Sequence, residues 1–430
     1  MSFGSFIQQL RREGLLVEAQ RPVAKRLEAS GLIAALQGRP VFFHVKESPI
    51  PMAANICASR QLVAHYFDTE DAELIPRLLQ AMENPSKARE IQSASCFEVR
   101  EDHVNLDILP ILYHYEGDGG CYITSAVTIA RHRDVGQNMS FHRLMQISRD
   151  TFAIRILPRH LNALIEKSGG EIDAAFCIGT SPNVLLAAAT SVELGVDELW
   201  VANTLKSLDV AYCTEADCFV PADSEFVLVG TITRELHDEG PFVDITGTYD
   251  VVRKQPVVKI KTIYHRRTPI YQALLPGGLE HKLLMGTPRE PAVWRAVSKV
   301  CHCIDVRLTP GGCSWLHGIV KIRKDGEDDG LKAVEAAFRG HPSMKHVVVV
   351  DEDIDISKPE EVEWALATRF QANRGLVVKN GEKGSSLDPS ADPMTRITTK
   401  VGFDATLPKT STAERFRRAS PQKLDFHQYV

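Results

Sequence analysis

Two long stretches of strand-like composition in the middle of the chain most constrain its fold. Residues 225–233 and 257–264 are rich in β-branched and aromatic side chains. They flank the stretch Glu239-Gly-Pro-Phe-Val-Asp244, in which Gly and Pro favour a tight reversal of the backbone. A reversal there would let the two carboxylates converge on one point, although an ordinary solvated hairpin loop has the same composition. The centre of the chain is therefore predicted to be a β-rich domain that presents two acids beside a turn.

Helix and strand patterns divide the rest of the sequence into units on either side of this centre. Residues 1–104 alternate between the two patterns, as in a small N-terminal α/β domain. Residues 105–287 form the β-rich unit, which we predict to be a barrel-like sheet with inserted helices. A linker helix over 288–305 leads into a second α/β domain at 306–430, whose end, from residue 380 onward, has no clear periodicity. The predicted fold class is thus α/β (α+β) with three domains.

Composition and charge exclude some classes of function. The chain has 430 residues, of which 44% are hydrophobic and 24% charged, as in an ordinary globular protein. Its net charge of −5 argues against nucleic acid as the main partner. No apolar run approaches the length of a membrane span, and the first residues lack the apolar core of a signal peptide. Nine scattered cysteines suggest reduced thiols, so we expect a cytoplasmic protein.

Several residues outside the turn could take part in chemistry. Arg143 lies in a strand-like stretch and offers a planar fork for a carboxylate, or for the acids of the 239–244 turn. Strict alternation would place it on the opposite face from Asn138 unless a bulge intervenes. Asn138, His160 and Glu198 supply oxygen and imidazole ligands, which suit Mn²⁺ or Mg²⁺, although their spacing is too wide to identify a site by itself.

Short motifs mark the chain from residue 119 to residue 406. They are Gly-Gly-Cys-Tyr-Ile at 119–123, Asn-Met-Ser-Phe-His-Arg at 138–143, Arg-His at 159–160, Glu198, Val-Pro-Ala-Asp-Ser-Glu at 220–225, Glu-Gly-Pro-Phe-Val-Asp at 239–244, Asp-Glu-Asp-Ile-Asp at 351–355, Ala-Thr-Arg at 367–369 and Thr-Lys-Val-Gly-Phe-Asp-Ala-Thr at 399–406. In their order and spacing they resemble the UbiD family of prenylated-FMN-dependent decarboxylases, over nearly the whole chain. Each motif is modest alone, whereas the set is highly specific.

The resemblance implies roles for the matching residues. An acid, an arginine and a second acid would form the catalytic group: Glu239, Arg143 and Asp244. The family binds prenylated FMN together with a Mn²⁺ or Mg²⁺ ion that bridges to the cofactor phosphate. The metal ligands would be Asn138, His160 and Glu198. These three residues and Arg143 would also contact the cofactor, together with Met139, Ser140, Phe141, His142, Arg159 and Lys345.

The chain departs from the family pattern at a few positions. Asp244 stands where some members have Glu, which shortens the side chain by one methylene. Arg159 stands where others have Gln. Ala188 and Ala189 replace a serine pair near the phosphate, which leaves a K⁺ site open to question.

The resemblance also implies an architecture and partners. The family combines an N-terminal α/β domain, a central split β-barrel that holds the flavin, and a C-terminal α/β domain used for dimerisation. This agrees with the division that the helix and strand patterns predict. A homodimer, or a hexamer built as a trimer of dimers, is expected, with a flavin prenyltransferase as the supplier of the cofactor.

The implied reaction is the reversible, non-oxidative loss of CO₂ from an α,β-unsaturated acid. Loss of CO₂ leaves negative charge on an sp² carbon, which side chains alone cannot stabilise enough. A flavin is therefore needed as the electron sink, while the protein positions the substrate and supplies a proton. The short chain is similar to archaeal members that convert trans-anhydromevalonate 5-phosphate to isopentenyl phosphate. Ser314 and His317 could bind the phosphate or a hydroxyl group of this substrate. Glu280 and His281 lie in the segment 275–285, which could form a mobile lid.

Other functions stay open at this stage. A 4-hydroxy-3-polyprenylbenzoate or another aromatic acid would be an alternative substrate, and it would call for a wide apolar channel. An FMN-dependent reductase belongs to a different class, since split barrels also hold flavins for hydride transfer. A non-catalytic flavin- or metal-binding protein would be favoured if Arg143, Glu239 and Asp244 proved to lie apart.

Overall fold

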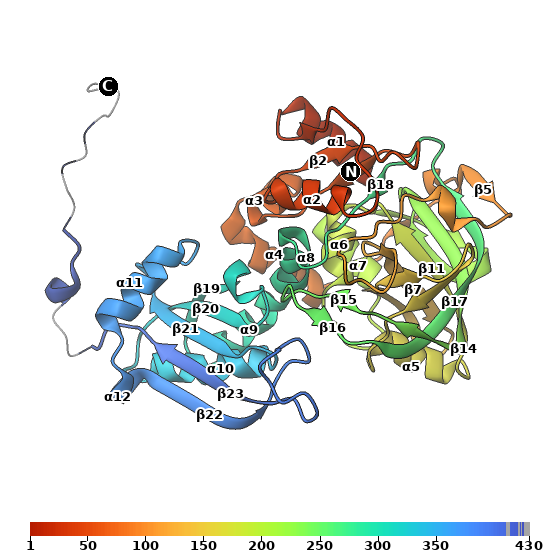
Figure 1. The fold of residues 1–430 in the computed structure, drawn as a ribbon. Helices are drawn as coiled ribbons and strands as arrows, with labels where there is room; N and C mark the ends of the chain where they lie inside the picture. Colours follow the sequence, from red (N-terminus) through yellow and green to blue (C-terminus); the bar gives the residue numbers. More distant parts are fainter. Residues whose placement is uncertain (410–412, 420–421, 423, 425–430) are drawn as a thin grey trace.

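The structure, a computed structural model, describes residues 1–409, 413–419, 422 and 424. Figure 1 shows an N-terminal group of helices (red to orange) above a large curved sheet (yellow to green), with a separate C-terminal sheet (blue) beside them. One buried hydrophobic cluster joins the N-terminal helices to the central domain, whereas the C-terminal domain has a separate cluster, to which Ile75 of the N-terminal domain also contributes. Within the described residues, no helix is long and apolar enough to cross a membrane.

The N-terminal domain packs helices around a small sheet. Ser2 caps its first helix, because the Ser2 Oγ accepts a hydrogen bond from Ser5 N at 3.1 Å. The helices are α1 (Phe3–Arg12), α2 (Glu28–Ala35), α3 (Arg60–Tyr66) and α4 (Leu74–Glu83), and the strands are β1 (Val17–Glu18), β2 (Val41–Phe43) and β3 (Met52–Ala54). β18 (Tyr271–Gln272) pairs in parallel with β3, so a segment from beyond the central sheet completes this domain.

The central domain is built on one nine-stranded sheet. Its strand order is β6-β9-β10-β17-β14-β11-β7-β8, with β5 paired to β17. The strands are β5 (Val99–Glu101), β6 (Tyr122–Ile123), β7 (Val127–His132), β8 (Gly136–Phe141), β9 (Leu144–Gln146), β10 (Thr151–Ile154), β11 (Ile172–Ile178), β14 (Phe226–Glu239) and β17 (Arg253–His265). In the part of the chain that is described, no pairing joins the end strands β6 and β8.

The two strands predicted from the sequence, β14 and β17, form the long antiparallel pair of this sheet. Both extend beyond the predicted 225–233 and 257–264, toward the turn that carries the acids. Their register shifts between Val229 and Gly230 and again between Ile232 and Leu236, and such bulges bend a sheet and increase its twist. The bend lets a single sheet curl around its own core.

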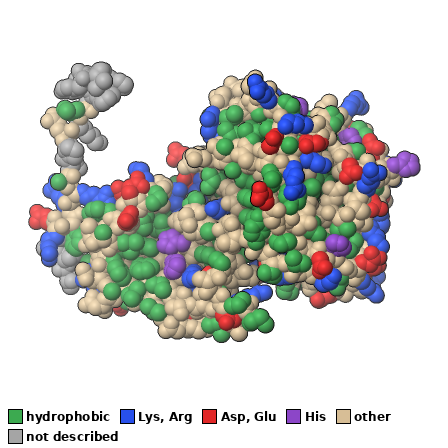
Figure 2. All heavy atoms as spheres, in the orientation of Figure 1, with side chains coloured by type: hydrophobic (Ala, Val, Ile, Leu, Met, Phe, Trp, Pro, Cys, Tyr) green, Lys and Arg blue, Asp and Glu red, His purple; other side chains and the backbone are tan. Residues whose placement is uncertain are grey.

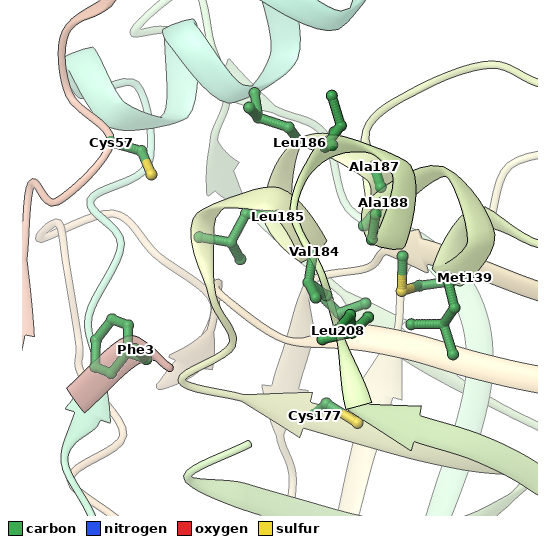
Figure 3. Close-up of a cluster of buried hydrophobic side chains, with 14 of the residues drawn as sticks. Phe3, Cys57, Met139, Cys177, Val184, Leu185, Leu186, Ala187, Ala188 and Leu208 are labelled. Carbon is green, nitrogen blue, oxygen red and sulfur yellow. The ribbon is translucent and has the colours of Figure 1, made fainter. Parts of the chain in front are cut away.

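Helix α6 (Pro182–Ala188) lies between the N-terminal helices and the sheet. Every residue of α6 is buried. Figure 3 shows its side chains surrounded by Met139 of β8, Cys177 of β11 and, from the N-terminal domain, Phe3 and Cys57. The other helices around the sheet are α5 (His160–Lys167), α7 (Glu198–Leu205) and α8 (Leu279–Gly286), and a smaller sheet joins β4 (Arg89–Glu90), β12 (Asp209–Cys213) and β13 (Cys218–Pro221). The packing of α6 against both the N-terminal helices and the central sheet gives the first two domains one shared core.

The C-terminal domain is a five-stranded sheet with helices on both faces. Alternate residues of its central strand enter two different clusters, Val347 and Val349 one and Val348 and Val350 the other. The strand order is β19-β20-β21-β23-β22. The elements are α9 (Glu290–Ser298), β19 (His302–Leu308), β20 (His317–Arg323), α10 (Asp329–Gly340), β21 (His346–Asp351), α11 (Pro359–Arg369), α12 (Ala372–Gly375), β22 (Leu376–Lys383) and β23 (Ile397–Asp404). The predicted α/β (α+β) fold class is confirmed.

The stretch from residue 380 onward, which has no clear periodicity in its sequence, contributes a strand to this sheet. β23 lies inside the sheet, parallel to β21 and antiparallel to β22. Its own sequence contains buried Thr398 and Lys400, which hide the usual alternation of apolar and polar residues. The strand is therefore held by pairing on both edges rather than by its own hydrophobic pattern.

Candidate active site

Arg143 lies in a break between two strands rather than inside one. β8 ends at Phe141 and β9 begins at Leu144, so strict alternation does not extend from Asn138 to Arg143. The backbone carbonyl of Arg143 accepts a hydrogen bond from Arg155 N at 3.2 Å, which ties the break to the end of β10. The break frees Arg143 from the face that alternation would impose, and its side chain can turn toward the acids.

The structure brings both acids of the predicted turn onto Arg143. Glu239, the last residue of β14, accepts two hydrogen bonds from the guanidinium, Nε to Oε1 and Nη2 to Oε2, each at 2.8 Å. Asp244 Oδ2 lies 3.4 Å from Nη1. Glu239 is 0% exposed, and the fork-to-carboxylate geometry is the strong bidentate type. The two acids therefore share one buried cation.

The site also contains three residues that the sequence argument did not select for it. Asp250, in the short strand β16 (Tyr249–Asp250), is a third acid on Arg143, with Oδ2 at 3.2 Å from Nη2. The Tyr122 hydroxyl donates to Glu239 Oε1 at 3.1 Å, and the Phe242 ring lies under the guanidinium at 4.3 Å. Asp250 reaches the site because β16 pairs back onto β15 (Phe242–Val243), and only a predicted hairpin after the turn could have signalled this.

The electrostatics of the cluster keep Arg143 charged and leave Asp244 the least constrained acid. Burial alone would lower the pKa of Arg143, but Glu239, then Asp244 and Asp250, raise it above its ordinary value. Burial would raise the pKa of Asp250, but Arg253 and Arg143 together hold it below its usual range. Asp244 has the longest contact with the guanidinium and its side chain is 18% exposed. It is therefore the acid best placed to exchange a proton with a ligand.

Asn138 and Glu198, two of the three predicted metal ligands, lie in direct contact. Asn138 Nδ2 donates to Glu198 Oε1 at 2.9 Å, and Met139 N donates to Oε2 at 2.7 Å. Burial raises the pKa of Glu198 to about 8, which a nearby cation would reverse. No cation from the described side chains forms an ion pair with it, so the donor set fits a hard divalent ion.

The third predicted ligand, His160, is the first residue of α5, which packs against β8. Burial, and then the charge of Arg159, lowers the pKa of His160, so that it is neutral, as a metal ligand must be. Within the described chain, no group of three His, Cys, Asp or Glu side chains is placed to hold a metal ion. The predicted ligands Asn138, His160 and Glu198 differ from such groups, because one of the three ligands is the amide oxygen of Asn138.

The remaining predicted cofactor residues lie on and just after β8, in front of α5, and in the C-terminal domain. On β8, Met139 and Phe141 face the hydrophobic cluster beside α6, whereas Ser140 Oγ contacts Asn138 Oδ1 at 3.2 Å and His142 Nε2 at 3.1 Å. Arg159 is exposed and precedes α5.

Lys345, the last of the predicted cofactor residues, lies in the C-terminal domain. Its Nζ pairs with Asp388 Oδ2 at 3.0 Å and also contacts Ser390. Lys345 is therefore paired with side chains of the C-terminal domain, and it lies on a different domain from β8.

Glu280 and His281 lie in the first turn of α8 (Leu279–Gly286) but face different surroundings. Glu280 is buried and accepts hydrogen bonds from Asn55 N and Cys57 N, each at 2.8 Å, which joins α8 to the N-terminal domain. His281 Nδ1 accepts a hydrogen bond from Gly277 N at 3.0 Å. Burial lowers the pKa of His281 and the negative charge of Asp244 opposes this, which places His281 beside the acid cluster.

Ser314 and His317 lie on the C-terminal domain. Ser314 is buried in a left-handed conformation (φ 50°) against Gly286, the last residue of α8, where a β-carbon would come within 2.7 Å of Ser314 Cβ. His317 begins β20 and its ring centre lies 6.1 Å from that of His346. Burial and then His346 lower the pKa of His317 to about 4, so it is neutral at pH 7.

Comparison with known proteins adds a family to this geometry. The chain matches the models of three domains of 3-octaprenyl-4-hydroxybenzoate carboxy-lyase: the N-terminal domain at residues 7–82, the Rift-related domain at 88–279 and the C-terminal domain at 282–405. The chain belongs to the UbiD family of carboxy-lyases. The three matches cover nearly all of the described residues.

Individual relatives of this UbiD-family chain are similar over their whole length. An anhydromevalonate phosphate decarboxylase of Methanothermobacter thermautotrophicus is 42% identical, over 97% of this chain and 99% of the relative. The UbiD-class enzyme HmfF from Pelotomaculum thermopropionicum, solved in complex with FMN, has a TM-score of 0.97 at 35% identity and covers 100% of both chains. An evolved dimeric form of the same enzyme, in complex with prFMN, has a TM-score of 0.92 at 33% identity and covers 100% of both chains.

Proposed function

We propose that the protein is a prenylated-FMN-dependent decarboxylase that converts trans-anhydromevalonate 5-phosphate to isopentenyl phosphate and CO₂. The observation that carries the reaction class is the guanidinium of Arg143, which holds Glu239 and Asp244 together. The substrate is inferred from the full-length similarity to a relative named anhydromevalonate phosphate decarboxylase.

Each residue of the acid cluster has a distinct task in this proposal. When bound, the prenylated flavin would supply an electron sink for the electron pair that stays on the substrate carbon when CO₂ leaves. Arg143 orients the substrate carboxylate and stays charged throughout. Glu239, fully buried and paired twice, fixes the guanidinium. Asp244 delivers the proton that replaces CO₂ on the alkene carbon, since its contact with Arg143 is the longest of the three.

The ligand set for cofactor and metal follows from the second cluster. Asn138, His160 and Glu198 would hold one Mn²⁺ or Mg²⁺ ion next to the cofactor phosphate. Residues 139–141 of β8, and His142 and Arg143 in the break that follows it, would contact the cofactor beside this ion. The support is the direct contact between Asn138 and Glu198 and the buried, uncompensated carboxylate of the latter. A K⁺ ion has less support, because Ala188 and Ala189 offer no side-chain oxygen.

Assembly is proposed to use the C-terminal domain. Its edge strand β22 exposes Leu376 (41%) and Val378 (50%), and Ile397 of the neighbouring β23 is 49% exposed. Figure 2 shows hydrophobic side chains gathered over the C-terminal lobe, whereas acidic and basic side chains are interspersed over the central domain. An exposed edge with apolar side chains favours pairing with a second copy, as a homodimer or within a hexamer.

The proposal is tested by loading the protein with its cofactor. Co-expression with a flavin prenyltransferase, the expected supplier, should give a bound species with the mass of prenylated FMN. The loaded enzyme should then release CO₂ from the phosphorylated enoic acid. Turnover of a 4-hydroxy-3-polyprenylbenzoate with none of the enoic acid would identify the alternative substrate. NAD(P)H-driven flavin reduction, with no decarboxylation, would instead support the FMN-dependent reductase.

A further inference from the structure

Arg289 is an enclosed cation without a counter-charge. It ends the short helix η5 (Thr287–Arg289), which joins α8 to α9 where the central domain meets the C-terminal domain. Its Nη1 donates to Ser191 Oγ, and its guanidinium lies 5.6 Å from the centre of the Trp315 ring. Its Nε is shielded from solvent and has no hydrogen-bond partner. No carboxylate among the described residues forms an ion pair with it.

Two other enclosed arginines of the chain, Arg60 and Arg369, are neutralised by carboxylates. Arg60 pairs with Asp71 and Glu290, and Arg369 pairs with Asp351 at 2.9 Å. Enclosing an unpaired charge is costly, whereas pairing it with a hydrogen-bonded anion offsets much of the cost. Arg289 therefore stands out as a group whose surroundings lack an anion.

A second arginine, Arg159, makes the surroundings of Arg289 more positive, and the neutral His341 lies beside them. Burial, and then the charge of Arg159, lowers the pKa of Arg289 to about 10, so it keeps its proton at neutral pH. His341 Nε2 contacts the Trp315 carbonyl at 3.0 Å. Burial, and then Arg289, lowers the pKa of His341 to about 4, so it is neutral and can act as a polar wall. Arg289 therefore experiences the positive charge of a second arginine.

The position of these residues indicates the kind of anion. Ser191 follows α6, and Arg159 directly precedes His160, a proposed ligand of the metal beside the cofactor phosphate. Trp315 follows Ser314, a proposed substrate residue. The cluster therefore lies between the phosphate end of the cofactor site and the C-terminal domain.

We propose that Arg289, Arg159 and Ser191 bind the phosphate group of a phosphate monoester, with Trp315 as the apolar wall of the site. Planar guanidinium groups suit phosphate because each offers two parallel N–H donors. Such a site deepens the proposed function and rests on it, since two phosphate monoesters are then present. One is the substrate, through its 5-phosphate, and the other is the flavin, through its ribityl phosphate.

Flavin binding to the apoprotein tests the cofactor as the source of the phosphate. The variants are Arg289→Ala and Arg289→Gln, and the matched control is Arg295→Ala on α9, whose side chain is 52% exposed. If the site takes the ribityl phosphate, the Arg289 variants bind FMN about 10- to 100-fold more weakly, because a charge-assisted contact is lost. Riboflavin, which has no phosphate, should bind wild type and variants alike.

Kinetics of the loaded enzyme test the substrate as the source. If the site takes the 5-phosphate, the Arg289 variants raise KM for the phosphorylated enoic acid about 10- to 100-fold, with FMN binding unchanged. Inorganic phosphate should raise the melting temperature of wild type and Arg295→Ala more than that of the Arg289 variants.

The proposal is overturned if the Arg289 variants, folded by circular dichroism, match Arg295→Ala in FMN affinity, in KM and in the shift caused by inorganic phosphate. Failure of the proposed function has a different signature. In that case the loaded wild-type enzyme does not act on the phosphorylated enoic acid, while FMN and inorganic phosphate still distinguish Arg289 from Arg295. Arg289→Lys, which keeps the charge but not the fork, should fall between wild type and Arg289→Ala.

Discussion

Replacing Asp244 by Asn removes the proton assigned to the reaction and leaves the shape of the side chain nearly unchanged. Asp244 lies 3.4 Å from Arg143, compared with 2.8 Å for Glu239 and 3.2 Å for Asp250. Loss of so loose a pair should lower the free energy of unfolding by no more than about 1 kcal/mol. Loss of a positioned proton donor should lower kcat by about 10²- to 10⁴-fold, or about 3–5 kcal/mol in the barrier.

The assay compares CO₂ release by the loaded Asp244→Asn enzyme with that of wild type at equal cofactor content. The matched control is Asp238→Asn, on the same strand β14, where the side chain is 58% exposed and pairs only with Lys254 at 3.0 Å. Mass spectrometry should find the same bound cofactor in all three proteins. Wild-type turnover by Asp244→Asn would refute its role as the proton donor.

Three further predictions concern the surrounding charges. Arg143→Ala should impair both cofactor binding and turnover, and a flavin titration measures the loss of cofactor binding. It should also lower the free energy of unfolding by about 3–5 kcal/mol, because the carboxylate of Glu239 is left buried without its cation, and chemical denaturation measures this change. Glu198→Gln should weaken Mn²⁺ binding measured by calorimetry and reproduce the effect of a chelator on wild type, and equal affinity in both proteins would contradict the metal assignment. Burial raises the pKa of Glu280 to about 7, above its unfolded value near 4.5. Between these values the native state binds a proton that the unfolded state has released. The free energy of unfolding should therefore fall by about 3 kcal/mol as the pH rises from about 4.5 to 7. Glu280→Gln should flatten this part of the stability profile, and an unchanged slope would show that other groups cause it.

The positions of the side chains in the candidate site were only partly predictable from the sequence. Gly and Pro between Glu239 and Asp244 predicted a reversal, and the structure brings both acids to Arg143 there. Asp250 was missed, because its place depends on the pairing of β15 with β16, two short strands without a clear pattern. Lys345 is engaged by Asp388, a contact between segments that no local pattern connects.

Local patterns were reliable where one element carries its own signal. The strands β14 and β17 are apolar and β-branched, so composition alone located them, although each proved longer than predicted. β23 was overlooked because its buried Thr398 and Lys400 resemble loop composition, and its conformation depends on partners on both sides.

The sequence by itself determined the α/β (α+β) fold class and the two long strands, because both follow from the periodicity and composition of single stretches. It also predicted a division into three domains and the residue types of the candidate site, from periodicity and short motifs. The tertiary structure decided which side chains meet. Arg143 reaches its acids through a strand break, Asn138 meets Glu198 because α7 packs beside β8, and Arg289 is enclosed where two domains meet. These contacts join residues far apart in the chain, and their geometry depends on packing and on bulges that bend the sheet, which no single stretch of sequence encodes.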